Sequence, residues 1–348
     1  MMDYDKGKRM LGEEAAMHHS VMLPIQYPPI TSYQHHAATL SIMAAHGEYL
    51  PWFCSNYIQL RVNVNPDSRP WLDFFSFLYD GFHNCPYLRV QHLEAGLMEE
   101  LCPDVAEFAV RSLRLGYYVY AVIDCGLVPA YADYGQGAAP HPVLLYGCDA
   151  ERELLHAGDF FRGRFAFATI GFDELRRAFR AVEAGAFHFV GAKLIRPHAE
   201  ESYKLDLQTV GELFADYLYS RETENRYRMD RNLNPDIRKG LDPVYDRLTL
   251  EVERHLDDPA IFHLTSFHVL HDHKKAIVRI LAYLRERGHV RHDYGYVKLE
   301  AAALAVRNTI LKYSLRPSSK LREQIVRMLA ALREAERSAL TELLAEWR

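Results

Sequence analysis

The hydrophobic pattern of the chain changes near residue 200, and this change constrains the fold more than any other feature. Before it, short apolar runs are separated by proline and glycine, which is typical of mixed strands and helices. After it, apolar residues recur at helical spacing over long segments, at residues 207–220, 243–256, 266–287, 299–315 and 317–347. The sequence therefore predicts a flexible tail at residues 1–20, an α+β domain at 21–200 and an all-helical domain at 201–348.

Composition and charge exclude several classes of protein. Apolar residues make up 49% and charged residues 25% of the 348 residues, which is ordinary globular usage rather than that of a disordered chain. The formal net charge of −5 argues against a dedicated nucleic-acid binder. No apolar run is long enough to cross a membrane, and residues 1–20 lack the apolar stretch of a signal peptide. We therefore expect no membrane and no nucleic-acid partner.

The cysteines bear on compartment and cofactors. All five, Cys54, Cys85, Cys102, Cys125 and Cys148, are sparse along the chain, and no two of them form a C-x-x-C pair. This indicates free thiols in a reducing cytoplasm, without disulfides or a thiolate zinc site. No cofactor-binding motif stands out, so we predict no cofactor.

Shorter elements are predicted within the first part. An Ala-rich segment stopped by Gly47 predicts a helix over residues 35–46. A continuous aromatic and β-branched run at 117–123 predicts a buried strand. By the same reasoning, strands are expected at 56–64, 141–147, 154–157 and 188–196, and helices at 103–115 and 172–183.

One pair of residues suggests acid–base chemistry. His141 opens a predicted strand and Asp159 follows the returning strand 18 positions later. A hairpin between them can bring an imidazole and a carboxylate together, as a general base requires. The alternative is an ordinary hairpin with two solvated polar ends, and the spacing alone leaves both open.

A family resemblance covers roughly residues 25–195. It is carried by YVYAVIDC (118–125), PAY (129–131), HPVLLYGCD (141–149), GD (158–159) and FDEL (172–175). These segments resemble the N-terminal domain of the butirosin biosynthesis protein H family, which is similar to the double-glycine bacteriocin-processing peptidases. The resemblance implies a papain-like fold. It also implies transfer of an acyl group, through a cysteine, from a carrier-protein thioester to an aminoglycoside amine.

By this resemblance, His141 is the catalytic base and Asp159 its orienting acid. Asp124, at the end of a strand, and Tyr131, in the following loop, are expected at the substrate site. The family places its cysteine at the start of the first helix, but the matching residues 33–40 contain none. His35 or His36 stands near that position, and Gln34 is a candidate for the oxyanion hole.

Three interpretations of the missing nucleophile stay open. The domain has lost cysteine chemistry and now binds a ligand or catalyses differently; Cys54 supplies the thiol from a neighbouring loop; or Cys125 is the nucleophile. Cys125 is the least favoured because its neighbour Asp124 raises a thiol pKa. The alternative interpretation of Cys54 is a small buried apolar residue beside Trp52.

Two further clusters are candidates for function. His268 and His271 are one helical turn apart and, with Asp272, predict a weak candidate metal site. Five basic residues predict either a solvated surface or a patch for an acidic carrier protein: Arg226, Arg228, Arg231, Arg238 and Lys239.

The sequence thus predicts a cytoplasmic protein of bacterial specialised metabolism, such as nonribosomal peptide synthesis. Its expected activity is the transfer or release of an acyl or peptidyl group held on a carrier protein. The alternatives are a catalytically inactive papain-like protein that binds a peptide or carrier-bound intermediate, and a metal-dependent hydrolase. The expected partners are a carrier protein and a small-molecule or peptide substrate. The C-terminal helices are expected to cap a cleft or to form a homo-oligomer interface.

Overall fold

A computed structural model describes residues 20–76, 81–198, 202–227, 234–259 and 262–347 of the chain. Its fold is mixed α+β with an antiparallel sheet and a C-terminal helical region, which confirms the coarse prediction. The contacts divide it into two compact units, of residues 1–27 with 88–198 and of residues 28–87 with 199–348. One unit boundary thus lies near residue 200, as expected, whereas residues 28–87 group with the C-terminal helices.

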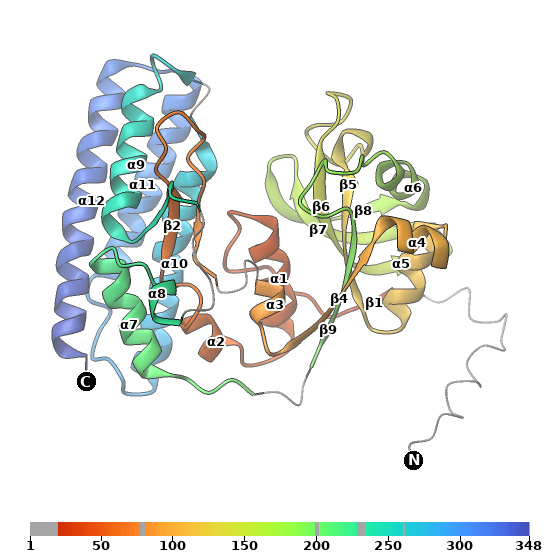
Figure 1. Ribbon diagram of the computed structural model, residues 1–348, viewed down its shortest axis with the longest axis horizontal. Helices are drawn as coiled ribbons and strands as arrows, with labels where there is room; N and C mark the ends of the chain where they lie inside the picture. Colours follow the sequence, from red (N-terminus) through yellow and green to blue (C-terminus); the bar gives the residue numbers. More distant parts are fainter. Residues whose placement is uncertain (1–19, 77–80, 199–201, 228–233, 260–261, 348) are drawn as a thin grey trace. The chain divides into compact units, whose positions relative to one another are not determined.

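The first unit is built on an antiparallel sheet, which holds seven strands among the described residues. Its strand order is β4-β9-β5-β6-β7-β8, and β1 pairs with β6 beside this path (Figure 1). The strands are β1 (Val21–Met22), β4 (Leu88–Glu94), β5 (Tyr118–Asp124), β6 (Pro140–Asp149), β7 (Leu154–Phe161), β8 (Arg164–Gly171) and β9 (Gly191–Pro197). Three of them, β1, β4 and β8, are not predicted from the sequence.

Helices α5 (Val105–Arg114) and α6 (Phe172–Arg180) cover this sheet, and α4 (Ala95–Leu101) follows β4. The apolar face of α5 contacts β5 and β6, while α6 contacts β5 and β8. Asp104 caps α5 by accepting hydrogen bonds from the N–H groups of Ala106 and Glu107. Every residue of β5 is buried, as its continuous apolar run predicts.

The hairpin of β6 and β7 sets the relation between His141 and Asp159. Leu144 on β6 lies opposite Gly158 on β7, so the antiparallel register brings Asp159 opposite the residue before Leu144. His141 precedes that residue by two positions on β6, so its side chain lies on the same face of the sheet. The strand pairing therefore makes His141 and Asp159, which are 18 residues apart in the sequence, diagonal neighbours across the two strands.

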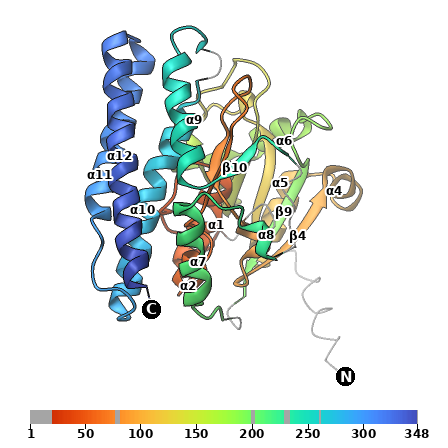
Figure 2. The same ribbon diagram turned by 60° about the vertical axis from the view of Figure 1, so that its left-hand side comes forward.

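The second unit combines a small antiparallel sheet with helices. Its strands, in the order β10-β2-β3, are β2 (Leu60–Asn63), β3 (Leu72–Phe74) and β10 (Ile237–Lys239). β10 lies within the part predicted to be all-helical, so that prediction is wrong at these residues. The strand is only three residues long and forms by pairing with the distant β2, where Ile237 lies opposite Asn63 (Figure 2). No local periodicity can reveal such a pairing.

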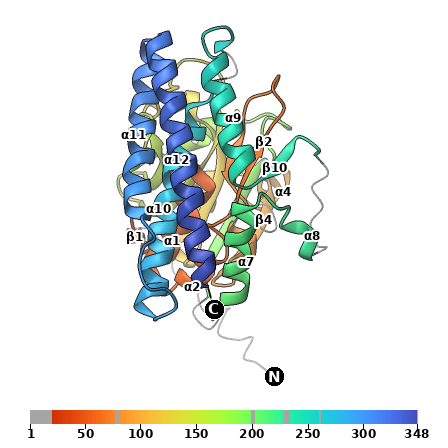
Figure 3. The ribbon, with the colours of Figure 1, turned by 90° about the vertical axis from the view of Figure 1, so that its left-hand side faces the viewer.

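Long helices form the rest of this unit, and Figure 3 shows α9, α11 and α12 side by side. The helices are α1 (Gln34–Ala45), α2 (Leu50–Cys54), α3 (Gly81–Asn84), α7 (Leu207–Leu218), α8 (Glu224–Tyr227), α9 (Leu241–Arg254), α10 (Leu264–Glu286), α11 (Tyr296–Leu315) and α12 (Ser319–Glu346). α12 contacts α7, α9 and α11, and α10 contacts β3. The five long segments predicted after residue 200 each correspond to one of α7, α9, α10, α11 and α12.

Candidate functional site

His141 and Asp159 of the first unit form a hydrogen-bonded pair. The distance from His141 Nε2 to Asp159 Oδ1 is 3.0 Å. Asp159 is fully buried, whereas the His141 side chain is 36% exposed. The carboxylate is therefore held inside the protein, and the imidazole that it contacts reaches solvent.

Two further donors hold the Asp159 carboxylate. The Tyr131 hydroxyl donates to Oδ2 over 2.5 Å, and the backbone N–H of Phe160 donates to Oδ1 over 2.7 Å. Tyr131 itself is 5% exposed, and its ring packs on Phe161. Tyr131, predicted at the substrate site, thus contacts Asp159 and acts on His141 only through that carboxylate.

These contacts define the state of the imidazole. Because a carboxylate accepts hydrogen bonds, Nε2 of His141 carries a hydrogen and donates a hydrogen bond to Asp159. When the ring is neutral, the Nδ1 lone pair is therefore available. No described residue bonds to Nδ1. Burial acts to lower the pKa of His141, but the charge and hydrogen bond of Asp159 outweigh it, so the net pKa is raised. The ring is a base of increased strength.

Asp124 organises the loop that precedes His141. Its Oδ1 accepts hydrogen bonds from the N–H groups of Gly126 and Ala139, both over 2.9 Å. A Cβ at Gly126 would lie 2.0 Å from the carbonyl oxygen of Gly137, so only glycine fits there. Asp124, predicted to bind substrate, is 8% exposed and uses its carboxylate to close this loop onto the start of β6.

The thiols are poor nucleophiles in this structure. All five cysteines are free, and Cys54, Cys85, Cys125 and Cys148 are buried. Burial raises the pKa of the Cys54 thiol to about 12, the opposite of what a thiolate nucleophile needs. Burial and Asp159 likewise raise the pKa of Cys125. Cys54 ends α2 among apolar side chains, as the alternative interpretation of a small buried hydrophobe predicts.

The other predicted site residues, Gln34, His35 and His36, begin α1 in the second unit. Gln34 is 3% exposed. His36 is buried and its Nε2 lies 2.8 Å from Oδ1 of Asp73, while Nε2 of the partly exposed His35 lies 3.3 Å from Oδ2 of the same carboxylate. Both imidazoles of the His35-His36 pair therefore converge on one buried acid.

Sequence reasoning missed Asp73, which is fully buried on β3. A single acidic residue between Leu72 and Phe74 in an apolar run was the available signal, because aspartate is rarely buried without a partner. Burial acts to raise the pKa of Asp73, but His36 and His35 outweigh it and hold the pKa well below its usual range. Burial lowers the pKa of His36.

The metal site predicted on α10 does not assemble. The Asp272 carboxylate accepts hydrogen bonds from the backbone N–H of Thr31, over 2.8 Å, and from Lys275, over 3.3 Å. His271 lies beside Arg307, with 3.4 Å between Nδ1 and Nη1. Among the described residues, the groups whose ligand atoms lie close enough for an ion are His35, His36, Asp73 and His292, Glu342, Glu346.

The predicted basic patch is not supported at Lys239. This side chain is 1% exposed and forms ion pairs with Glu222 and Glu224, so it is neutralised inside the unit. Arg238 is exposed. Arg228 and Arg231 lie outside the described residues, as does the side chain of Arg226.

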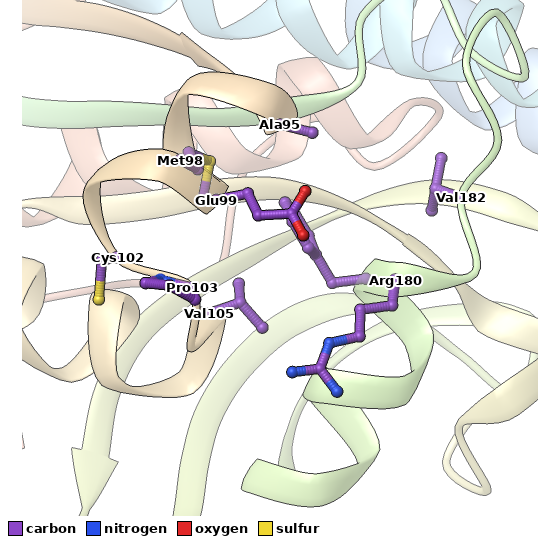
Figure 4. Close-up of a pocket in the computed structure, with 9 residues that line it drawn as sticks. Ala95, Met98, Glu99, Cys102, Pro103, Val105, Arg180 and Val182 are labelled. Carbon is purple, nitrogen blue, oxygen red and sulfur yellow. The ribbon is translucent and has the colours of Figure 1, made fainter.

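The first unit also holds a pocket of about 350 Å³ between α4, α5 and α6. Figure 4 shows the side chains of Glu99 and Arg180 at this pocket, together with Cys102. None of the predicted site residues lines it. The described helices include none long and apolar enough to cross a membrane.

No protein-family model matches the chain, and no curated protein is significantly similar to it. The resemblance to the butirosin biosynthesis protein H family therefore stays a prediction, carried by the residues around His141.

Proposed function

We propose that the chain transfers an acyl or peptidyl group from a carrier-protein thioester to an amine, with His141 as general base. The supporting observation is the His141–Asp159–Tyr131 arrangement. A buried carboxylate holds one imidazole nitrogen at 3.0 Å, and the other nitrogen keeps its lone pair. General-base catalysis requires these features. The papain-like fold and the carrier-protein partner belong to the same proposal.

The reaction needs no covalent enzyme intermediate. Nδ1 of His141 accepts a proton from the acceptor amine while the amine nitrogen attacks the thioester carbonyl carbon. The new C–N bond forms as the C–S bond breaks, and the imidazolium returns the proton to the leaving thiolate. The products are an amide and a free carrier thiol. Asp159 stabilises the imidazolium, and Tyr131 positions Asp159.

The buried thiols favour this direct route over a cysteine mechanism. Burial raises the pKa of both Cys54 and Cys125, so neither supplies a thiolate near neutral pH. An imidazole that activates an external amine replaces the missing nucleophile without any new residue.

The test uses the full chain with an acyl carrier protein that bears a short acyl thioester, and an aminoglycoside as acceptor. Wild type is expected to form acylated aminoglycoside and free carrier thiol, and mass spectrometry detects both products. His141→Ala is expected to lower kcat by about 10²- to 10⁴-fold, the usual contribution of a positioned acid–base group. His156→Ala, which removes the histidine of the neighbouring strand β7, is the matched control and is expected to keep full activity.

Three results would contradict this mechanism. Equal transfer by His141→Ala and wild type would remove the general base. An acyl adduct on wild type that disappears in Cys54→Ala would establish a thiol nucleophile instead. Binding of the acyl carrier without transfer in any variant would identify a binding protein of this fold.

A further inference from the structure

The cluster of His35, His36 and Asp73 in the second unit is independent of the proposed acyl transfer. The three residues come from the start of α1 and from β3. One ligand atom from each residue, a ring nitrogen or a carboxylate oxygen, lies within 4.8 Å of the other two.

The spacing suits a metal ion. Zinc–nitrogen bonds of about 2.0–2.1 Å in a tetrahedral site put neighbouring ligand atoms about 3.3 Å apart. The separation of His35 Nε2 and Asp73 Oδ2 is 3.3 Å. His36 Nε2 and Oδ1 are 2.8 Å apart, so this pair needs to open by about half an ångström to admit an ion.

Tyr57 gives His36 the outer partner that a metal ligand uses. The Tyr57 hydroxyl lies 3.2 Å from Nδ1 of His36. The hydroxyl oxygen can accept a hydrogen bond from Nδ1–H, and in that tautomer the Nε2 lone pair is free to bind a cation. Phe74 N–H donates to Oδ1 of Asp73 over 2.8 Å and fixes the carboxylate.

Two buried oxygen atoms at the cluster have unfilled hydrogen-bonding capacity. Asp73 Oδ2 has no well-aligned hydrogen-bond donor among the described residues, although His35 and Arg61 approach it. The buried hydroxyl of Tyr33 also has no partner within that set. Its ring stacks on His35, with 5.6 Å between ring centroids and 18° between planes. Buried polar atoms are rarely left in this state, and each such atom calls for a missing ligand or water.

We propose that His35, His36 and Asp73 bind one divalent first-row transition ion, of which Zn²⁺ is the probe. Two histidines and one carboxylate leave a coordination position open, as in catalytic rather than structural zinc sites. The Arg61 guanidinium lies 3.7 Å from Oδ2 and its charge opposes the ion. We therefore expect weaker binding than at a closed structural site.

The experiment measures Zn²⁺ binding by the metal-stripped full chain against a chromophoric chelator, and Co²⁺ binding by visible absorption. Wild type is expected to bind one ion per chain. His35→Ala and Asp73→Asn are each expected to weaken binding by more than about 100-fold, because even outer partners contribute 10- to 100-fold. Tyr57→Phe is expected to weaken it by about 10-fold.

His292→Ala is the matched control, since it removes a histidine from the other group of nearby ligand atoms. It is expected to leave the affinity unchanged. If circular dichroism shows that Asp73→Asn is unfolded, the test rests on the Zn²⁺ affinity of His35→Ala. The His35 side chain is 28% exposed, so its loss disturbs packing least. The proposal is overturned if wild type takes up no stoichiometric Zn²⁺, if His35→Ala binds as wild type does, or if His292→Ala abolishes binding.

Discussion

The buried charge pair of Lys274 and Glu336 gives the most direct stability prediction for the second unit. Both side chains are fully buried, and 2.5 Å separates Nζ from Oε1. Lys274 also donates to Nδ1 of His273 over 2.9 Å and to the Tyr217 hydroxyl over 3.4 Å. The three protons of the ammonium group therefore each have an acceptor. Glu336 in turn accepts from the Tyr245 hydroxyl over 2.8 Å.

Glu336→Gln removes the countercharge and leaves Lys274 charged and buried. Breaking a buried pair in this way costs about 3–5 kcal/mol. A unit of about 210 residues loses roughly 2–4 °C in Tm per kcal/mol, so the expected fall is about 6–20 °C. Thermal unfolding by circular dichroism and urea denaturation both measure it. Glu323→Gln, which breaks the exposed Arg327–Glu323 pair, is the control and is expected to change stability by less than about 0.5 kcal/mol.

The double variant Lys274→Met with Glu336→Gln separates charge from packing. It removes both charges, and the side-chain amide oxygen that it introduces can still accept a hydrogen bond from Tyr245. Its cost is therefore expected to be clearly smaller than the sum of the two single costs. A Tm change below about 2 °C for Glu336→Gln, or strict additivity in the double variant, would refute the reasoning that the ion pair dominates this core.

Three further predictions concern pH and packing. Nuclear magnetic resonance is expected to give a His141 pKa above 6.5 in wild type and a lower pKa in Asp159→Asn, because burial is then opposed only by the charge of Asp133; equal values would exclude the coupling. The charged pair stabilises the folded state below pH 6.5, and this contribution is lost as pH rises through the folded pKa. Gly126→Ala is expected to lower the free energy of unfolding by about 1–3 kcal/mol in urea denaturation. Gly96→Ala is not expected to lower it, because a Cβ at Gly96 would meet open space. Equal changes in the two variants would contradict the steric argument. Burial raises the pKa of Glu251 to about 8, so stability is expected to fall as pH rises from about 5 to 8, and Glu251→Gln should remove this fall; an unchanged slope would exclude Glu251 as its cause.

Local sequence pattern determined much of the first unit near His141. The run ending at Asp124 predicts β5. The hairpin pattern allows His141 and Asp159 to lie together but leaves two solvated ends as the alternative, and the 3.0 Å contact decides for the pair. Antiparallel strands joined by a short turn bring residues of this separation near one another, but the register of β6 and β7 decides that these two side chains meet. The sequence pattern does not predict that Asp124 holds the loop or that Tyr131 holds the Asp159 carboxylate, because both roles depend on side-chain directions.

The convergence of His35, His36 and Asp73 was decided by tertiary structure. The helix that carries the two histidines was predicted, but its burial against β3 depends on contacts that the local pattern does not encode. The same holds for β10, which exists only because it pairs with β2. Neither the buried state of Lys239 nor the loss of the α10 metal candidate had any local signal.

Taken by itself, the sequence determined the helices after residue 200, the main strands of the first unit and the hairpin that carries His141 and Asp159. Periodicity and turn chemistry are local, and each of these features follows from residues close along the chain. Only the tertiary structure decided which acid faces the histidines of α1, which thiols are buried and how residues 28–87 group. Those outcomes depend on packing between distant segments, where burial and charge are set by neighbours that the sequence does not place side by side.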